Sequence, residues 1–171
     1  MSIYTKIVIT DTNIITDLDN CQLLDIFIKL DNVYMCDLVK NDEINEKTTS
    51  KNVFTFIKCL SLDENMFEEV IKLSMIHRKL SFYDLANYVI AKTYNGILAT
   101  GDERLRRFVI ENGIEVIRTL KIIETLFENK IINKEKLLHS LDLLLENEKT
   151  RIPKEDIKKL KEKYVKKKFT T

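Results

Sequence analysis

Short runs of β-branched and apolar residues, each beside turn-forming residues, restrict what this chain can fold into more than any other feature. Four such runs lie in the segments "KIVITD", "LDNVYMCD", "YNGILATGD" and "ENGIEVIRT". Between them the apolar spacing becomes helical, as in Leu23, Leu24, Phe27 and Ile28. Strands that alternate with amphipathic helices predict an α/β fold, in which helices cover both faces of a parallel sheet.

Helical spacing continues in the rest of the chain. Further stripes are predicted over residues 53–60, 67–74 and 82–90. Gly96 and Gly113 are expected where helices end, because glycine takes the left-handed cap conformation cheaply.

The strand pattern stops after Thr119. The remaining residues indicate three helices, over 120–128, 134–146 and 154–167. We therefore predict an α/β domain over residues 1–119 and a helical C-terminal extension, residues 120–171, packed on the same domain. With 171 residues and 44% hydrophobic content, the chain suits one compact core.

Several classes of protein are not expected. The start "MSIYTKIVIT" lacks the basic and apolar regions of a secretory signal, and no apolar run approaches the ~20 residues that span a bilayer. No membrane contact is therefore expected. Three scattered cysteines in apolar surroundings predict reduced core residues of a cytoplasmic protein. Because the two histidines lie far apart and pair with no cysteine, a zinc site is not expected.

Charge is unevenly distributed along the chain. Eight lysines and three acids lie between Lys154 and Lys168, so this segment carries +5, whereas the remainder carries −4. A basic C-terminal arm is typical of nucleic-acid contact, and it is equally typical of a solvated helix face.

Acidic residues follow the ends of predicted strands. Asp11 ends the first strand, and Asp102 ends "ILATGD". Asp84 lies early in the helix "SFYDLANYVIA", for which Ser81 is a plausible N-cap. In open parallel sheets, ligands bind at the carboxyl ends of the strands. These acids are therefore candidates for one shared site.

The second strand contributes a further acid. Asp42 and Glu43 follow "VYMCDLV" by about one helical turn. The two side chains project about 100° apart on a helix, so only one of them can face the site. Glu43 is the narrow preference, because its side chain reaches further, and Asp42 is the alternate.

Each of these acids also has a structural interpretation, as a helix cap or a solvated surface group. Four acids near the ends of the strands indicate a shared functional site rather than four separate structural roles. Clustered carboxylates repel one another and hold protons unless a cation neutralises them. Oxygen ligands alone suit Mg²⁺ or Mn²⁺. Such an ion activates water for in-line displacement at a phosphate.

The segments "VITDTNIITDL", "LVKNDEI", "SFYDLANYVIA" and "LATGDERLRRF" occur in this order. Together they resemble the PIN-domain ribonucleases over roughly residues 5 to 118. The resemblance implies a three-layer α/β/α fold with a short central parallel sheet of four to five strands. The helical C-terminal extension is similar to that of a prokaryotic, toxin-like subgroup of the family.

The resemblance also implies roles for individual residues. Asp11, Asp84 and Asp102 match the catalytic, metal-binding acids of the family, and Glu43, with Asp42 as alternate, matches the fourth. Supporting polar residues of the site are expected from the following set: Thr12, Asn13, Ser81, Thr100 and Glu103.

The function implied is hydrolysis of RNA phosphodiester bonds with Mg²⁺ or Mn²⁺, leaving 5′-phosphate and 3′-hydroxyl ends. RNA is the expected substrate. The resemblance to the toxin-like subgroup further implies a toxin of a type II toxin–antitoxin pair. The expected partners are a cognate antitoxin protein and a second copy of the chain. Arg104, Arg106 and Arg107 are candidates for contact with the flanking RNA backbone.

Two other classes of α/β protein also place an aspartate after the first strand, and the sequence fits neither. A haloacid-dehalogenase-type phosphatase needs a second aspartate where Asn13 stands. A receiver domain needs a paired acid and a conspicuous late lysine, and neither is found. The serious alternative is a catalytically weak PIN-like module that binds nucleic acid or protein. Metal affinity at Asp11 and Asp102 would distinguish the two classes, because a nuclease needs a bound metal and a binding module does not.

Overall fold

The structure, a computed structural model, describes residues 3–40 and 56–166. Its centre is a sheet of five parallel strands in the order β3-β2-β1-β4-β5. The strands are β1 (Val8–Thr10), β2 (Val33–Cys36), β3 (Cys59–Leu60), β4 (Ile97–Ala99) and β5 (Glu115–Ile117). The predicted parallel α/β fold is confirmed.

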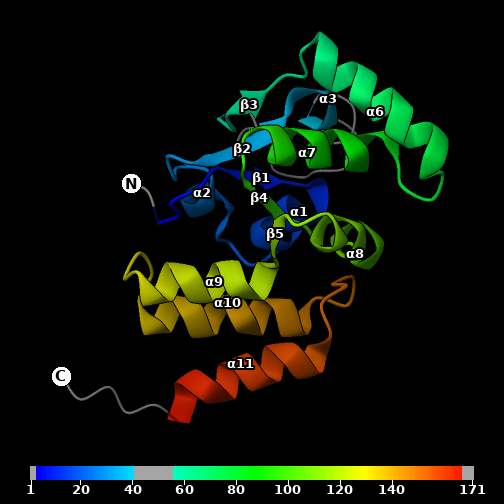
Figure 1. The fold of residues 1–171 in the computed structure, drawn as a ribbon. Helices are drawn as coiled ribbons and strands as arrows, with labels where there is room; N and C mark the ends of the chain where they lie inside the picture. The colour runs from blue at the N-terminus through cyan, green and yellow to red at the C-terminus, as the bar shows by residue number, and fades with distance from the viewer. Residues whose placement is uncertain (1–2, 41–55, 167–171) are drawn as a thin grey trace.

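Helices connect and cover the strands. The described helices are α1 (Thr12–Asn20), α2 (Leu24–Phe27), α3 (Asp37–Val39), α6 (Glu64–Ile76), α7 (Phe82–Thr93), α8 (Glu103–Glu111), α9 (Thr119–Glu128), α10 (Lys134–Glu146) and α11 (Lys154–Lys166). Figure 1 shows α6 and α7 on one side of the sheet and α1, α9 and α10 on the other, with α11 outermost. The C-terminal helices begin and end within one residue of their predicted limits.

Helix α7 forms the centre of one layer. Every residue from Leu85 to Ala91 is buried, because α7 lies between the sheet and α6. A ring contact between Tyr88 and Phe108, 4.8 Å between centroids, joins α7 to α8. α7 therefore packs against the sheet, α6 and α8.

One predicted helix is wrong in its described part. Cys59 and Leu60, expected in a helical stripe over 53–60, form β3 and pair with Met35 and Cys36 of β2. A short apolar run does not distinguish a buried strand from a helix by its spacing. The first residues of that stripe, and Asp42 and Glu43, lie outside the described residues.

The two glycines behave differently. Gly113 takes a φ of 76° after α8, as predicted. After α7 the left-handed residue is Asn95, with φ 48°, so the cap predicted at Gly96 is wrong. Gly96 is needed for close approach instead, because a Cβ there would lie 2.9 Å from Ile7 Cγ1 and from Ile7 O.

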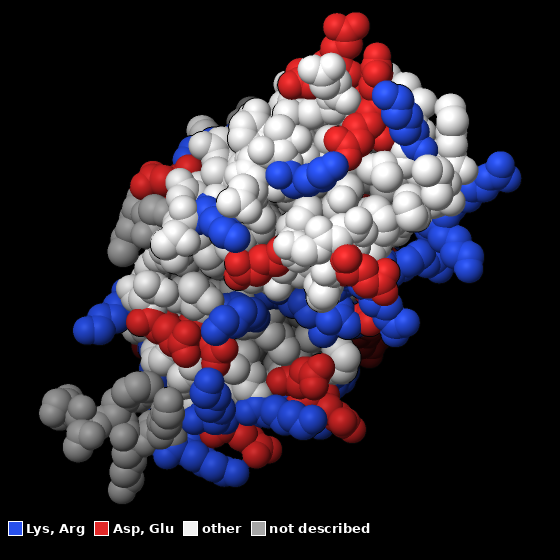
Figure 2. Space-filling model, viewed as in Figure 1, with Lys and Arg blue, Asp and Glu red and all other residues white. Residues whose placement is uncertain are grey.

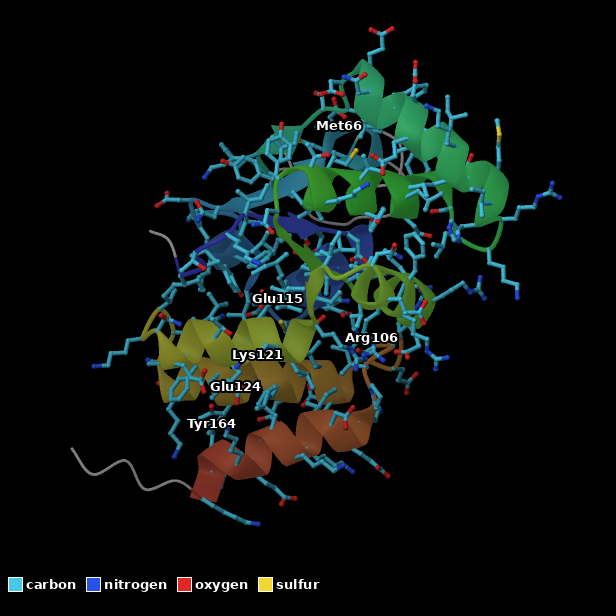
Figure 3. The ribbon with its side chains drawn as sticks, in the orientation of Figure 1. Met66, Arg106, Glu115, Lys121, Glu124 and Tyr164 are labelled. Carbon is cyan, nitrogen blue, oxygen red and sulfur yellow. The ribbon has the colours of Figure 1, made fainter. Side chains whose placement is uncertain are left out.

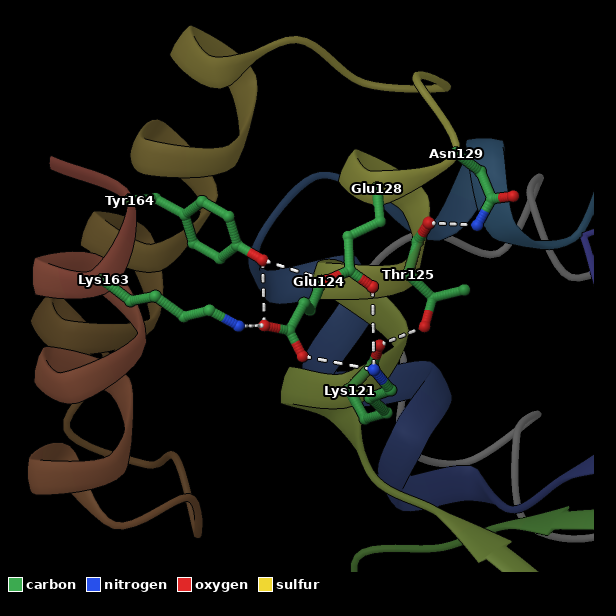
Figure 4. Close-up of polar contacts among 7 residues, drawn as sticks. All are labelled: Lys121, Glu124, Thr125, Glu128, Asn129, Lys163 and Tyr164. Carbon is green, nitrogen blue, oxygen red and sulfur yellow. Dashed lines mark hydrogen bonds and ion pairs between the residues drawn. The ribbon is translucent and has the colours of Figure 1, made fainter. Parts of the chain in front are cut away.

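Helices α9 and α11 are joined by polar side-chain contacts. Tyr164 of α11, which is 2% exposed, donates its hydroxyl to Glu124 Oε1 of α9 at 2.9 Å. Lys163 also donates to Glu124, and Lys121 pairs with Glu124 at 3.3 Å and Glu128 at 3.7 Å (Figures 3 and 4). α11 is therefore attached to α9 through its last turn.

The basic arm is partly neutralised. Lys161 pairs with Asp142, Lys163 with Glu124 and Lys166 with Glu162. On the face in Figure 2, basic and acidic side chains are mixed over the C-terminal helices. The division of the chain near residue 119, where α9 begins, stays a prediction.

All three cysteines are free thiols; Cys21 and Cys36 are buried, and Cys59 is half-buried. Among the described residues, no helix has the length and apolar character that crossing a membrane requires.

Candidate functional site

The sheet changes direction between β1 and β4. From β1 the chain proceeds outward to β2, and from β4 it proceeds to β5 on the opposite side. The crevice between two such strands, beyond their carboxyl ends, is the usual ligand site of an open parallel sheet. Asp11 follows β1 and Thr100 follows β4, so the first two candidate residues lie directly at this point.

Asp11 is a helix cap and a buried acid at the same time. Its Oδ1 accepts the Ile14 amide of α1 at 2.9 Å, and its Oδ2 accepts the Thr100 hydroxyl. Asp11 is only 6% exposed. Burial raises the pKa of Asp11 to about 7, the two hydrogen bonds oppose this, and the negative charges of Asp84 and Asp17 add to it.

Asp102 is joined to Asp11 through Thr100. The Asp102 amide donates to Thr100 Oγ1 at 3.1 Å, and that hydroxyl donates to Asp11. Asp102 caps α8, because its Oδ1 accepts the amides of Arg104 and Leu105 at 2.9 and 2.8 Å. Both hydrogen bonds use Oδ1, so the second oxygen accepts none from another described residue.

Asp84 is oriented by a capping box at the start of α7. Ser81 Oγ accepts the Asp84 amide at 3.0 Å, and Asp84 Oδ2 accepts the Ser81 amide at 2.8 Å. The predicted cap at Ser81 is confirmed. Asp84 borders the same cleft as Asp11 and Asp102, whereas Ser81 does not border it and supports the site only through Asp84.

The strand-end cleft has a volume of about 1030 Å³. The predicted site residues that line it are Asp11, Thr12, Asn13, Asp84, Asp102 and Glu103. Glu103 is engaged elsewhere: Arg106 and Arg107 pair with it at 2.6 and 3.0 Å, and these bonds lower its pKa to about 2. The structure thus brings most of the predicted residues together, while their roles stay a prediction.

The arginines expected to contact RNA near Asp102 have other partners. Arg104 donates to the backbone oxygen of Lys79 at 2.9 Å, while Arg106 and Arg107 hold Glu103. Their side chains are therefore committed to contacts within the protein.

Several residues lining the cleft were missed by sequence reasoning, among them Asp17, Thr119 and Asn87. Asp17 accepts the Thr119 hydroxyl at 2.8 Å, and burial raises its pKa. Thr119 follows β5 closely, so the strand-end argument would have found it. Asn87 lies one turn after Asp84; it is 2% exposed, and its Oδ1 has no hydrogen-bond partner among the described residues.

The donors in the cleft fit a divalent cation by their chemistry. They are carboxylate, hydroxyl and amide oxygens, which Mg²⁺ and Mn²⁺ prefer. Burial, and to a lesser degree the charges of Asp84 and Asp17, raises the pKa of Asp11, and a cation would favour its charged form; the Asn87 oxygen, unpaired among the described residues, is a further acceptor. Within residues 3–40 and 56–166, no three acidic, histidine or cysteine side chains converge closely enough to hold an ion.

A doubly wound parallel sheet with carboxylates at its switch point defines an α/β domain with an acidic ligand site at the strand ends. A family model described as a PIN domain matches residues 7–166, so the chain belongs to the PIN-domain family. PIN domains are generally nucleases and usually use divalent metal ions. The match includes the C-terminal helices.

A solved structure supports the fold. PAE2754 from Pyrobaculum aerophilum aligns with a TM-score of 0.50 and 18% identity, over 68% of this chain and 93% of that chain. At this identity the likeness concerns the fold alone. No curated protein matches the sequence significantly.

Proposed function

We propose that this protein is a ribonuclease that hydrolyses RNA phosphodiester bonds with Mg²⁺ or Mn²⁺. The observation that carries the proposal is the chain of contacts from Asp11 through Thr100 to Asp102 at the switch point of the sheet. Both carboxylates are held by backbone amides of helix starts, so their positions are fixed before a ligand binds. Such preorganisation is what a catalytic site requires.

Asp11, Asp102 and Asp84 would hold the ion, with Glu43 or Asp42 as the fourth acid. A bound Mg²⁺ or Mn²⁺ supplies a water of lowered pKa as nucleophile and stabilises charge on the leaving oxygen. Thr100 orients Asp11, and Ser81 orients Asp84. Asn13, beside Gly101, lies close enough to contact substrate or bound water.

A mixed RNA pool incubated with the full-length chain tests the proposal. We expect cleavage with Mn²⁺ or Mg²⁺, none with EDTA, and none with Asp102→Asn, whose amide oxygen still caps α8. Asp63→Asn is the matched control, because Asp63 caps α6 through the Met66 amide at 2.8 Å and lies outside the cleft. Cleavage that survives in EDTA or in Asp102→Asn would refute the proposal.

One observation favours the alternative, a PIN-like module that binds RNA or protein with little catalysis. Asp11, Asp84 and Asp102 all have structural roles as caps, and the described acids form no three-ligand group. RNA binding without cleavage under every metal condition would favour this alternative.

The similarity of the sequence to toxin-like PIN domains extends the proposal to a toxin with a cognate antitoxin. Expression of the wild-type chain would then arrest growth, and Asp102→Asn would relieve the arrest. Growth unaffected by the wild-type chain would remove the toxin role and leave the ribonuclease proposal to the cleavage assay. A second copy of the chain is proposed as a further partner, and sedimentation of the purified protein tests it.

A further inference from the structure

The strand-end cleft has cationic residues as well as acids. Arg118 precedes α9, while Lys149 and Arg151 lie in the connection between α10 and α11, and all three line the cleft. Figure 1 shows this connection rising from the C-terminal helices toward α8. We call these three residues the basic wall. Through these residues, the C-terminal part of the chain lines the same cleft as Asp11 and Asp102.

The basic wall is available to a ligand. All three side chains are exposed, and none forms an ion pair with another residue in the described part of the chain. Lys121, the other base in the cleft, is held by Glu124 and Glu128. Exposed cations that form no direct ion pair beside a cleft are typical of anion binding.

The positive charges of the basic wall affect an acid in the same cleft, Asp17. Burial raises the pKa of Asp17, while the positive charges of Arg151 and Arg118 act in the opposite direction. Asp17 also accepts the hydroxyl of Thr119, the residue after Arg118. The cationic groups are thus close enough to affect a carboxyl on α1, the helix that Asp11 caps.

The connection that carries Lys149 and Arg151 is ordered by hydrogen bonds. The Lys149 amide donates to Asn147 Oδ1 at 2.9 Å, and the Ile152 amide donates to Thr150 Oγ1 at 3.3 Å. Ile152 is buried and lines the cleft. α11, which follows the connection, is held to α9 by contacts of Tyr164 and Lys163 with Glu124 near its C-terminal end.

We propose that the basic wall binds backbone phosphates of single-stranded RNA beside the carboxylates, so that the C-terminal helices supply part of the substrate site. This inference rests on the proposed ribonuclease function. The acids repel phosphate unless cations stand near them, and Arg118, Lys149 and Arg151 are the cations in the cleft without an acidic partner among the described residues. Guanidinium groups also bind phosphate through two parallel hydrogen bonds.

Binding of a labelled single-stranded RNA to the full chain, measured by anisotropy in EDTA from 50 to 300 mM salt, tests the inference apart from catalysis. The test variant combines Arg118→Gln, Lys149→Gln and Arg151→Gln. The control combines Lys154→Gln, Lys158→Gln and Lys159→Gln, three exposed lysines of α11 outside the cleft. Both variants lose the same charge. If the triple variant has a much lower melting temperature than the wild type, Arg151→Gln alone replaces it as the test variant.

For single strands, each lost phosphate contact reduces the slope of log K against log salt by about 0.7. The slope should therefore be smaller by about 2 in the triple variant and by about 0.7 in Arg151→Gln. The control should keep the wild-type slope. Equal slopes for the test and control variants, or no RNA binding by the wild type, would overturn the inference. Equally tight binding of a polyglutamate peptide would assign the basic wall to an acidic protein partner and also overturn it.

The two proposals fail separately. Cleavage by the wild type with an unchanged slope in the test variant removes the basic wall and keeps the ribonuclease. A reduced slope without cleavage by the wild type keeps the basic wall and removes the ribonuclease.

Discussion

Thr100 donates its hydroxyl to the carboxylate of Asp11, although the two residues lie 89 positions apart in the sequence. The same hydroxyl accepts the Asp102 amide at 3.1 Å. Thr100 therefore joins the ends of β1 and β4 and positions two of the proposed metal ligands. It is fully buried, so its hydrogen bonds do not compete with water.

Replacement of Thr100 tests this link. Thr100→Val keeps the shape and removes the donor, so we expect a loss of about 2 kcal/mol of unfolding free energy and a further rise in the pKa of Asp11. Thr100→Ser keeps the donor and loses a methyl group, about 1 kcal/mol. Denaturant unfolding and carboxyl NMR titration measure the two effects. An Asp11 pKa that is the same in both variants would contradict the role of the hydroxyl.

The raised pKa of Asp11 predicts a stability that depends on pH in EDTA. Between about pH 4 and pH 7 the folded protein keeps the Asp11 proton, whereas the unfolded chain has lost it. Unfolding then releases a proton, so Asp11 lowers the unfolding free energy as the pH rises through this window. Asp11→Asn should remove this contribution.

Melting temperatures at pH 4 and pH 8 measure the effect. Asp11→Asn should be more stable than the wild type at pH 8 and close to it at pH 4, and Asp63→Asn provides the matched loss of a cap charge. If Asp11→Asn melts below the wild type at both pH values, the carboxylate has only the structural role of a helix cap.

Asp84 and Ser81 separate metal binding from capping. Ser81→Ala removes one cap bond and should cost about 1 kcal/mol, or roughly 3 °C in melting temperature, with cleavage retained. Asp84→Asn keeps an oxygen for the Ser81 amide, so we expect it to melt close to the wild type and to lose cleavage. Melting temperature and RNA cleavage, measured for both variants under the same conditions, distinguish the two roles of Asp84. Cleavage by Asp84→Asn at the wild-type rate would leave Asp84 with the cap alone.

The contacts of Tyr164 predict how the C-terminal helices are held. Tyr164→Phe keeps the buried ring and removes the hydroxyl that Glu124 accepts, so we expect a loss of about 1 to 2 kcal/mol. Lys163→Met breaks a more exposed contact to the same carboxylate and should cost less than about 1 kcal/mol. Denaturant unfolding compares them. A larger loss for Lys163→Met would mean that the ion pair anchors α11.

Much of the fold was predictable because its signals are local. The strands ending at Asp11 and Asp102, the Ser81 cap and the three C-terminal helices all depend on short patterns of apolar and capping residues. β3 was missed because Cys59 and Leu60 form a strand only through pairing with β2, a contact that their own spacing does not reveal.

The site was predictable where residues follow strands, and at Asp84, where the Ser81 cap marks the start of a helix. Asp11, Thr100 and Asp102 meet because parallel strands end at one edge, and the same argument extends to Thr119 after β5. Lys149 and Arg151 reach the cleft through the packing of α10 and α11, for which the sequence carries no local signal.

The central claim is that the carboxylates at the ends of β1 and β4 bind a divalent cation. Calorimetric titration of the wild-type chain with Mn²⁺, beside Asp11→Asn, Asp102→Asn and the control Asp63→Asn, tests it most directly. We expect saturable binding by the wild type and by Asp63→Asn, and a loss of at least tenfold in affinity in the other two. Unchanged Mn²⁺ affinity in Asp11→Asn and Asp102→Asn, or no binding by the wild type, would contradict the claim.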